Sequence, residues 1–224
     1  MAVVVVTGAS RGLGLALAKR FAAGGDTVYG LARNPERLAQ AQAAHPDIEF
    51  AAVDVTDPEA VRDYFKGLTG VNVLINNAGT FTPHPIREEP EGFLEQVLRE
   101  NVLSASYCTH AVLQGMIRRK AGTIVNICSI ASVKGFATGG AYVASKHALL
   151  GYTRSLREEL KPYGIGVIAI LPGATLTSAW DGTGVDPTRI MDPEAVAALV
   201  HAAVQAGPGA VVEELMVRPA LGDL

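Results

Sequence analysis

Cysteine and aromatic residues are scarce in this chain of 224 residues, which contains two cysteines, one tryptophan and 6% aromatic residues in all. Cys108 and Cys128 lack the spacing of a metal site or of a disulfide framework, so we expect two buried free thiols. The five histidines are scattered along the sequence and form no ligand cluster. The sequence therefore predicts no metal site.

A strong excess of charge is also missing, because the formal net charge is only -3. No basic stripe with interleaved aromatic residues is present, which argues against nucleic acid as a partner. No apolar run approaches the roughly 18 residues that a membrane span needs, and the first expected strand begins at residue 2, which leaves no signal peptide. We therefore expect a cytoplasmic protein without a membrane partner.

Apolar residues make up 49% of the chain, and short apolar runs alternate with helical stretches. This alternation is typical of a parallel sheet with crossover helices, and the length suits one α/β domain over residues 1–224. We predict a doubly wound parallel sheet of about seven strands flanked by helices, with ligands bound at the carboxyl ends of the strands. The predicted strands span 2–6, 27–32, 48–53, 71–75, 122–128, 165–171 and 211–217. The predicted helices span 12–24, 35–44, 58–67, 91–118, 139–161 and 193–206.

Three glycines follow the first predicted strand, in Thr7-Gly8-Ala9-Ser10-Arg11-Gly12-Leu13-Gly14. The helical spacing of Leu13, Leu17, Ala18 and Phe21 starts a helix at this loop, where backbone amides and the helix dipole favour a pyrophosphate. The spacing GxxxGxG differs from the GxGxxG dinucleotide motif. A tight turn that needs glycines for steric reasons alone is the alternative.

Tyr142-Val-Ala-Ser-Lys146 places a phenol and an ammonium group four residues apart. Apolar positions 141, 144, 148, 152, 156 and 160 predict a helix that brings the two side chains to the same face. A free tyrosine has a pKa of about 10, and a nearby cation lowers it. We expect Lys146 to lower the pKa of Tyr142, and Tyr142 to serve as a general acid or base.

Ser129 ends a predicted strand, where its hydroxyl can donate to a carbonyl oxygen as negative charge develops there. A nucleophilic serine is the rival interpretation. It is disfavoured because the chain has no GxSxG elbow.

Several of these motifs occur in the order and spacing of a known family: the glycine loop, Asn76-Asn77-Ala78-Gly79, Asn101, Ser129, Tyr142 with Lys146, and Pro172-Gly173. From Val3 to about Pro219 the chain resembles the compact, non-extended subgroup of the short-chain dehydrogenase/reductase family. The resemblance implies a Rossmann-like fold and an NADP(H)-dependent oxidoreductase that reduces a ketone or aldehyde to an alcohol, or catalyses the reverse. The substrate is then a small carbonyl or alcohol.

The resemblance also implies site residues. The implied catalytic residues are Asn101, which would hold a water that relays protons to Lys146, and Ser129, Tyr142 and Lys146. A structural role is expected for Asn76. The implied cofactor-binding residues are Gly8, Ser10, Arg11, Gly12, Leu13, Gly14, Arg33, Asp54, Val55, Asn77, Ala78, Gly79, Tyr142, Lys146, Pro172, Gly173, Thr175 and Thr177.

Cofactor preference depends on the end of the second predicted strand. Ala32 stands where NAD-preferring members of the family usually have an acidic residue, Arg33 follows it, and Arg11 adds a second cation. Guanidinium groups suit a phosphate, so we predict NADP(H) over NAD(H), with ordinary solvated arginines as the alternative. Asp54 resembles the residue that accepts a hydrogen bond from the adenine amino group. A cap of the helix that begins near Pro58 is the alternative role of Asp54.

The segment near 177–192 is expected to form a short substrate lid, in which Trp180 covers an apolar substrate or packs within the lid. The stretch Thr80–Ile86 is expected to form another wall, with Phe81 as the substrate contact. Ketoacyl reductases of the family that act on carrier proteins tend to have arginines where this chain has Thr123 and Tyr163. Their absence weakens a role in fatty-acid synthesis.

Two-fold pairing of helices 91–118 and 139–161 predicts a homodimer or homotetramer. Tetramer contacts through the last strand are in doubt, because 211–219 departs from the glycine-rich closing strand of the family. A non-catalytic, NADP(H)-binding regulatory protein on the same fold is the alternative function. The full set of four catalytic residues argues against it, and the chain length argues against an epimerase or dehydratase of the extended subgroup.

Overall fold

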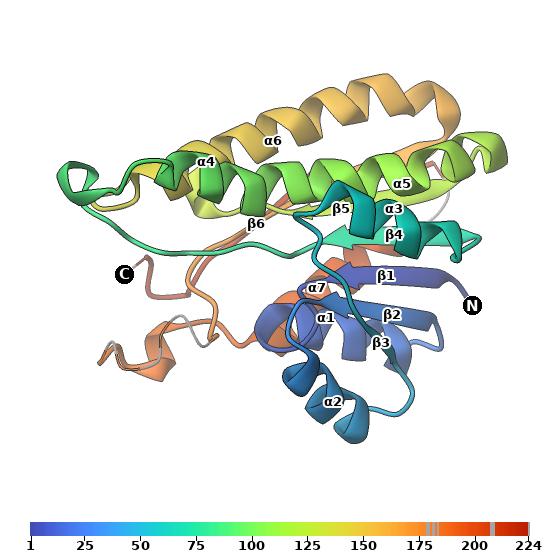
Figure 1. Ribbon diagram of the computed structural model, residues 1–224, viewed down its shortest axis with the longest axis horizontal. Coiled ribbons are helices and arrows are strands. Elements are labelled where there is room, and N and C mark those ends of the chain that lie inside the picture. The colour runs from blue at the N-terminus through green and yellow to red at the C-terminus, as the bar shows by residue number, and fades with distance from the viewer. Residues whose placement is uncertain (178–179, 181, 183, 207–208, 224) are drawn as a thin grey trace.

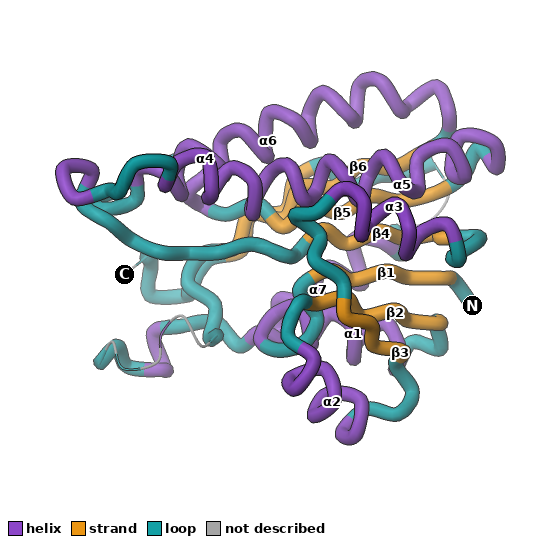
Figure 2. The backbone as a smooth tube through the Cα atoms, viewed as in Figure 1, coloured by secondary structure: helices purple, strands orange, loops and turns teal. Residues whose placement is uncertain are grey.

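The protein is described here by a computed structural model that covers residues 1–177, 180, 182, 184–206 and 209–223. Within this part of the chain, seven parallel strands form one sheet in the order β3-β2-β1-β4-β5-β6-β7, which confirms the predicted fold class. Figure 2 shows the sheet between two layers of helices. The strands are β1 (Val3–Thr7), β2 (Thr27–Ala32), β3 (Glu49–Ala52), β4 (Val71–Asn76), β5 (Gly122–Ile127), β6 (Ile165–Pro172) and β7 (Glu214–Val217).

Helices cover both faces of the sheet (Figure 1). One face packs against α1 (Gly12–Ala23) and α7 (Pro193–Val204), with α2 (Pro35–Ala44) beside β3. The other face packs against α3 (Pro58–Lys66), α5 (Ser104–Arg119) and α6 (Gly140–Leu160). The central strands are therefore buried on both sides, which explains their continuous apolar runs.

Three of the helices begin with the same local signal. A proline opens each of α2, α3 and α7, and the residue before it is Asn34, Asp57 or Asp192. Each of these side chains accepts a hydrogen bond from a backbone N–H in the first turn of its helix, at 2.8 to 2.9 Å. Proline needs no such partner and has a helical φ, so Asn-Pro and Asp-Pro fix these helix starts.

The helix predicted over 91–118 is present as a continuous helical run, but it is not α-helical throughout. The chain instead forms α4 (Phe93–Leu98), a π-helical segment η2 (Arg99–Leu103) and then α5. The last strand is also shorter than predicted, since 211–213 lie outside β7. The other predicted elements agree with the structure to within two residues at each end.

The sheet reverses its winding between β1 and β4, which are neighbours although residues 8–70 lie between them in the sequence. We call the boundary between β1 and β4 the seam. The Thr7 hydroxyl lies at this seam and accepts hydrogen bonds from the backbone N–H of Asn77 (3.0 Å) and of Ala78 (2.9 Å). The Asn77 amide in turn donates to the Thr7 carbonyl (2.9 Å). The seam brings the glycine loop and the segment after β4 together, at the edge where doubly wound sheets bind ligands.

None of the helices in the described part of the chain is both long and apolar enough to cross a bilayer. Cys108 and Cys128 are buried free thiols, as predicted.

Candidate active site

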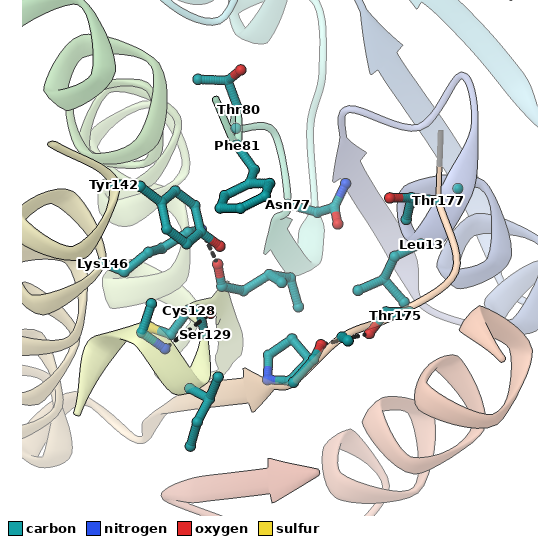
Figure 3. Close-up of a pocket in the computed structure, with 18 of the residues that line it drawn as sticks. Leu13, Asn77, Thr80, Phe81, Cys128, Ser129, Tyr142, Lys146, Thr175 and Thr177 are labelled. Atoms are coloured by element: carbon teal, nitrogen blue, oxygen red, sulfur yellow. Dashed lines mark hydrogen bonds between the residues drawn. The ribbon is translucent and has the colours of Figure 1, made fainter. Parts of the chain in front are cut away.

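A pocket of about 680 Å³ opens at the carboxyl ends of the strands (Figure 3). It brings together fourteen residues that the sequence singles out: Gly8, Arg11, Gly12, Leu13, Gly14, Asn77, Gly79, Ser129, Tyr142, Lys146, Pro172, Gly173, Thr175 and Thr177. Six others do not line it: Ser10, Arg33, Asp54, Val55, Ala78 and Asn101.

The glycine loop forms one wall of the pocket and leads into α1. No side chain caps α1, in contrast to α2, α3 and α7, and its first turn has no acidic residue. The backbone N–H groups of the first turn are thus available to an anion. Gly14 lets the loop fold tightly, because an added Cβ there would lie 2.2 Å from the Gly8 carbonyl oxygen and 2.5 Å from the Asn77 side-chain nitrogen. This geometry fits a pyrophosphate.

Ser129 lies two residues after the end of β5 and caps the short helix η3 (Ile130–Ser132). Its hydroxyl oxygen accepts a hydrogen bond from the Ala131 N–H (3.1 Å), and its own N–H donates to the Ser132 hydroxyl (3.2 Å). The Ser129 side chain also shares a hydrogen bond with Tyr142. Ser129 therefore has a fixed orientation toward the tyrosine.

Tyr142 and Lys146 lie one turn apart at the start of α6, with the Lys146 Nζ 5.7 Å from the centre of the Tyr142 ring. The expected direction of the tyrosine pKa is wrong in this structure. Burial raises the pKa of Tyr142, and the hydrogen bond with Ser129 opposes that rise only in part. The Lys146 Nζ donates to the Ile127 carbonyl (2.8 Å) and lies beside the tyrosine ring.

Lys146 itself is deeply buried, and this burial lowers its pKa from 10.5 to about 8. Below pH 8 both the folded and the unfolded chain carry the proton, and the folded chain bears the cost of burying the charge. Between pH 8 and 10.5 the unfolded chain binds more protons at this group, so its contribution to stability rises with pH.

We therefore expect Lys146→Met to be more stable relative to the wild type at pH 7 than at pH 10, because methionine carries no charge to bury. The change in the stability difference should be on the order of 3 kcal/mol at most. Urea unfolding at the two pH values measures it. Lys161→Met, at an exposed position directly after the same helix, controls for loss of one positive charge. An equal pH response of the two variants would contradict the prediction.

Asn101 lies in the π-helical segment η2 and is buried. Its side-chain oxygen accepts from the Thr80 N–H (2.7 Å), and its nitrogen donates to the Thr80 carbonyl (3.1 Å) and to the Ser145 hydroxyl (2.9 Å). Ser145 in turn donates to the Tyr142 carbonyl (2.7 Å). Gly79 permits this contact, since an added Cβ would lie 2.7 Å from the Asn101 side-chain oxygen. Asn101 thus connects two walls of the pocket through Ser145, which sequence reasoning did not single out.

Asn76 belongs to a buried polar network behind the pocket. Its side chain donates to Asn126 (2.8 Å) and to Thr109 (3.2 Å), and Asn126 donates to Thr153 (2.8 Å). These bonds join β4, β5, α5 and α6. Their position supports the structural role expected for Asn76.

Asp54 follows β3 and does not cap α3. Its side chain accepts from the Thr56 N–H (2.9 Å) and hydroxyl (2.7 Å), while Asp57 caps the helix. The alternative assignment of Asp54 as a helix cap is therefore wrong. Val55 is a core residue. Arg33 follows β2 and is exposed, and neither it nor Arg11 forms an ion pair with any described residue.

The predicted lid lies partly outside the described residues, at 178–179, 181 and 183. Trp180 lines the pocket, and its ring nitrogen donates to the Thr175 carbonyl (3.0 Å). Near the chain end, Asp223 also lines the pocket and pairs with Arg218 (2.6 Å) and Lys134 (3.4 Å). These last three residues gave no sequence signal, because the pairing depends on how the C-terminal segment folds back.

Comparison with known proteins gives a consistent result. Residues 2–186 match the short chain dehydrogenase family. The chain is 36% identical over 187 residues to the uncharacterized oxidoreductase YusZ of Bacillus subtilis, covering 80% of this chain and 66% of that protein. It is 33% identical over 233 residues to farnesol dehydrogenase of Aedes aegypti, covering 97% of this chain and 95% of that protein.

Among solved structures, a variant of actinorhodin polyketide ketoreductase with NADPH superposes with a TM-score of 0.90 at 29% sequence identity. The superposition covers 100% of this chain and 98% of the ketoreductase. The match to the family extends over most of the sequence and the likeness of fold over all of it. The chain therefore belongs to the short-chain dehydrogenase/reductase family of oxidoreductases.

Proposed function

We propose that this protein is an NADP(H)-dependent oxidoreductase that interconverts a carbonyl group and an alcohol, with Tyr142 as the general acid or base. One observation carries the proposal: Ser129, Tyr142 and Lys146 meet in the same pocket as the glycine loop. A hydroxyl donor, a phenol and a buried ammonium group are thus within reach of a ligand held at the start of α1.

The proposed roles follow from the local chemistry. A tyrosine with the ordinary pKa of about 10 is protonated at neutral pH, and burial raises the pKa of Tyr142 further, so its phenol can donate a proton to a carbonyl oxygen during reduction. Ser129 is oriented to donate a hydrogen bond to the same oxygen as negative charge develops on it. Lys146 would return a proton toward the tyrosine, and its lowered pKa makes that transfer easier near neutral pH.

Asn101 is proposed as a positioning residue. Its side-chain amide is engaged by Thr80 and Ser145, so a water relayed toward Lys146 would be held by the main-chain carbonyl of Asn101. The wide turn of η2 changes the direction of such carbonyl groups.

The pocket fits a nicotinamide dinucleotide. The uncapped start of α1 and the close packing at Gly14 suit the pyrophosphate, and small residues after β4 allow a ribose to approach the backbone. When bound, the nicotinamide supplies or accepts the hydride. We propose the cofactor contacts given by the sequence: the loop Gly8 to Gly14 with Ser10, Arg11, Gly12 and Leu13; Arg33, Asp54 and Val55; Asn77, Ala78 and Gly79; Tyr142 and Lys146; and Pro172, Gly173, Thr175 and Thr177.

Arg11 and Arg33 are proposed to select NADP(H). Replacing both with alanine should weaken NADPH binding by roughly 100-fold, because each guanidinium can form charge-assisted bonds with the 2′-phosphate. NADH binding should change little. Fluorescence titration with each cofactor measures both. Arg118→Ala, an exposed arginine in the last turn of α5, is the matched control. Equal losses for NADPH and NADH would contradict the assignment.

The function is tested by NADPH oxidation at 340 nm against ketones, aldehydes, quinones and acyl thioesters, with NADH in parallel. Turnover that prefers NADPH is expected. Tight binding of NADPH without turnover on any compound would favour a non-catalytic regulatory protein. We further propose a homodimer or homotetramer in the cytoplasm, paired through the outer faces of α5 and α6.

A further inference from the structure

Two phenylalanines from separate loops lie beside Tyr142 on the wall of the pocket. Phe81 contacts the tyrosine ring edge-on, with ring centres 4.9 Å apart at 73°. Phe136 is 6.3 Å from Phe81 and 6.5 Å from Tyr142, measured between ring centres. Figure 3 shows the Phe81 ring directly beside Tyr142. The three rings are too close together to admit another ring between them, so they form one continuous aromatic wall.

The wall is held in place before any ligand binds. The His84 N–H donates to the Thr138 carbonyl (2.7 Å), which joins the loop of Phe81 to the loop of Phe136. The Phe136 ring lies against Gly139, where an added Cβ would be 2.4 Å from it. The N–H of Thr80, the residue before Phe81, donates to the Asn101 side-chain oxygen. Both loops are therefore fixed by contacts within the protein.

Both phenylalanine rings nevertheless remain accessible, 38% for Phe81 and 43% for Phe136. Ile130, Ala131 and Trp180 extend the same lining. Lys134, the cation nearest in sequence to Phe136, is directed toward Asp223 (3.4 Å), which also pairs with Arg218 (2.6 Å). A preformed apolar surface next to polar groups is the usual composition of a small-molecule site.

We propose that Phe81 and Phe136 form an aromatic wall that binds the planar apolar group next to the substrate carbonyl, so that the protein acts on aryl or conjugated carbonyl compounds. The inference rests on the proposed function, because Tyr142 must act on the carbonyl held beside the wall. A flat aromatic group gains edge-to-face contacts with these rings that a saturated group of similar size lacks.

The test compares three ketones: acetophenone, cyclohexyl methyl ketone and 2-butanone. Wild-type protein should show its lowest KM for acetophenone. Phe81→Leu and Phe136→Leu should each raise that KM by roughly 10-fold, with a smaller change in kcat, and should lower kcat/KM for 2-butanone far less than kcat/KM for acetophenone. Ile86→Ala is the matched control, because Ile86 is an exposed apolar residue near the same loop that does not line the pocket.

Calorimetry of acetophenone binding to the protein saturated with NADP⁺ tests the aromatic wall separately from the proposed function, because it measures binding without turnover. If 2-butanone and acetophenone are reduced equally well by wild type and both leucine variants, the aromatic wall is wrong and the proposed function stands. If no ketone is reduced but acetophenone binds the wild type about 10-fold more tightly than the leucine variants, the function fails and the wall stands. Absence of both turnover and binding would overturn both.

Discussion

Replacing Tyr142 with phenylalanine should reduce kcat for carbonyl reduction by roughly 100- to 10,000-fold, since it removes the proposed proton donor. The ring that contacts Phe81 is retained, so the pocket should keep its shape. The melting temperature should therefore change little, and NADPH affinity should fall far less than kcat, because the Tyr142 hydroxyl is only one of the proposed cofactor contacts. Steady-state kinetics, cofactor titration and thermal unfolding measure the three quantities separately.

Tyr152→Phe is the matched control for this variant. Tyr152 lies on the same helix, and its hydroxyl donates to Ser106 outside the pocket (3.4 Å). This control should retain full activity. A Tyr142→Phe protein that keeps more than about a tenth of the wild-type kcat would show that another group supplies the proton.

Replacing Gly14 with alanine should destabilise the protein by about 2 kcal/mol or more and greatly weaken cofactor binding. Alanine ordinarily stabilises a helix relative to glycine by up to about 1 kcal/mol. At Gly14 the sign reverses, because the new Cβ meets the backbone oxygen of Gly8 at 2.2 Å. The loop or the start of α1 must then move, and the site proposed for the pyrophosphate moves with it.

Gly151→Ala gives the opposite expectation on a helix of the same protein. Gly151 lies within α6. Apart from the adjacent residues and the backbone of the helix itself, no atom lies within 4 Å of a Cβ added there. This variant should be as stable as the wild type or slightly more so. Chemical unfolding of both variants measures the contrast. Equal effects at the two positions would mean that the close packing at Gly14 is relieved at little cost.

The sequence was a good guide to the sheet for a physical reason. Parallel strands covered on both faces are apolar along their whole length. A continuous apolar run such as Val3 to Val6 therefore indicates a buried parallel strand. Because the strands are parallel, the residues that follow them lie at the same edge of the sheet. Most of the proposed site could therefore be located from chain order alone.

Helix α6 shows where hydrophobic pattern fails. Two of its predicted apolar positions, Ala144 and Ala148, are exposed, whereas Lys146, Thr153 and Arg157 are buried. The buried polar groups are satisfied: Thr153 accepts from the Asn126 side-chain amide of β5 (2.8 Å), and Arg157 donates to the Val167 carbonyl of β6 (3.0 Å). A polar side chain can be buried once its hydrogen bonds are made, and those partners come from other elements that the local pattern does not reveal.

The sequence pattern also predicted neither the π-helical segment η2 nor the position of Phe136 in the pocket. The side chain of Asn101 is held by partners in two distant segments, Thr80 and Ser145. Phe136 reaches the pocket because its loop pairs with the loop around His84. Both features depend on contacts between residues far apart in the chain, so no local propensity could indicate them.

The hydrogen bonds of Thr7 have a consequence for the lifetime of the protein. They close the seam between β1 and β4, and the pocket lies across that seam. A ligand that contacts residues on both sides of the seam holds the two halves of the sheet together. By mass action it stabilises the folded protein relative to forms in which the halves have separated. Resistance to proteases, which attack opened chains, should therefore rise with the supply of cofactor. The amount of this protein in a cell would then follow the concentration of the proposed cofactor.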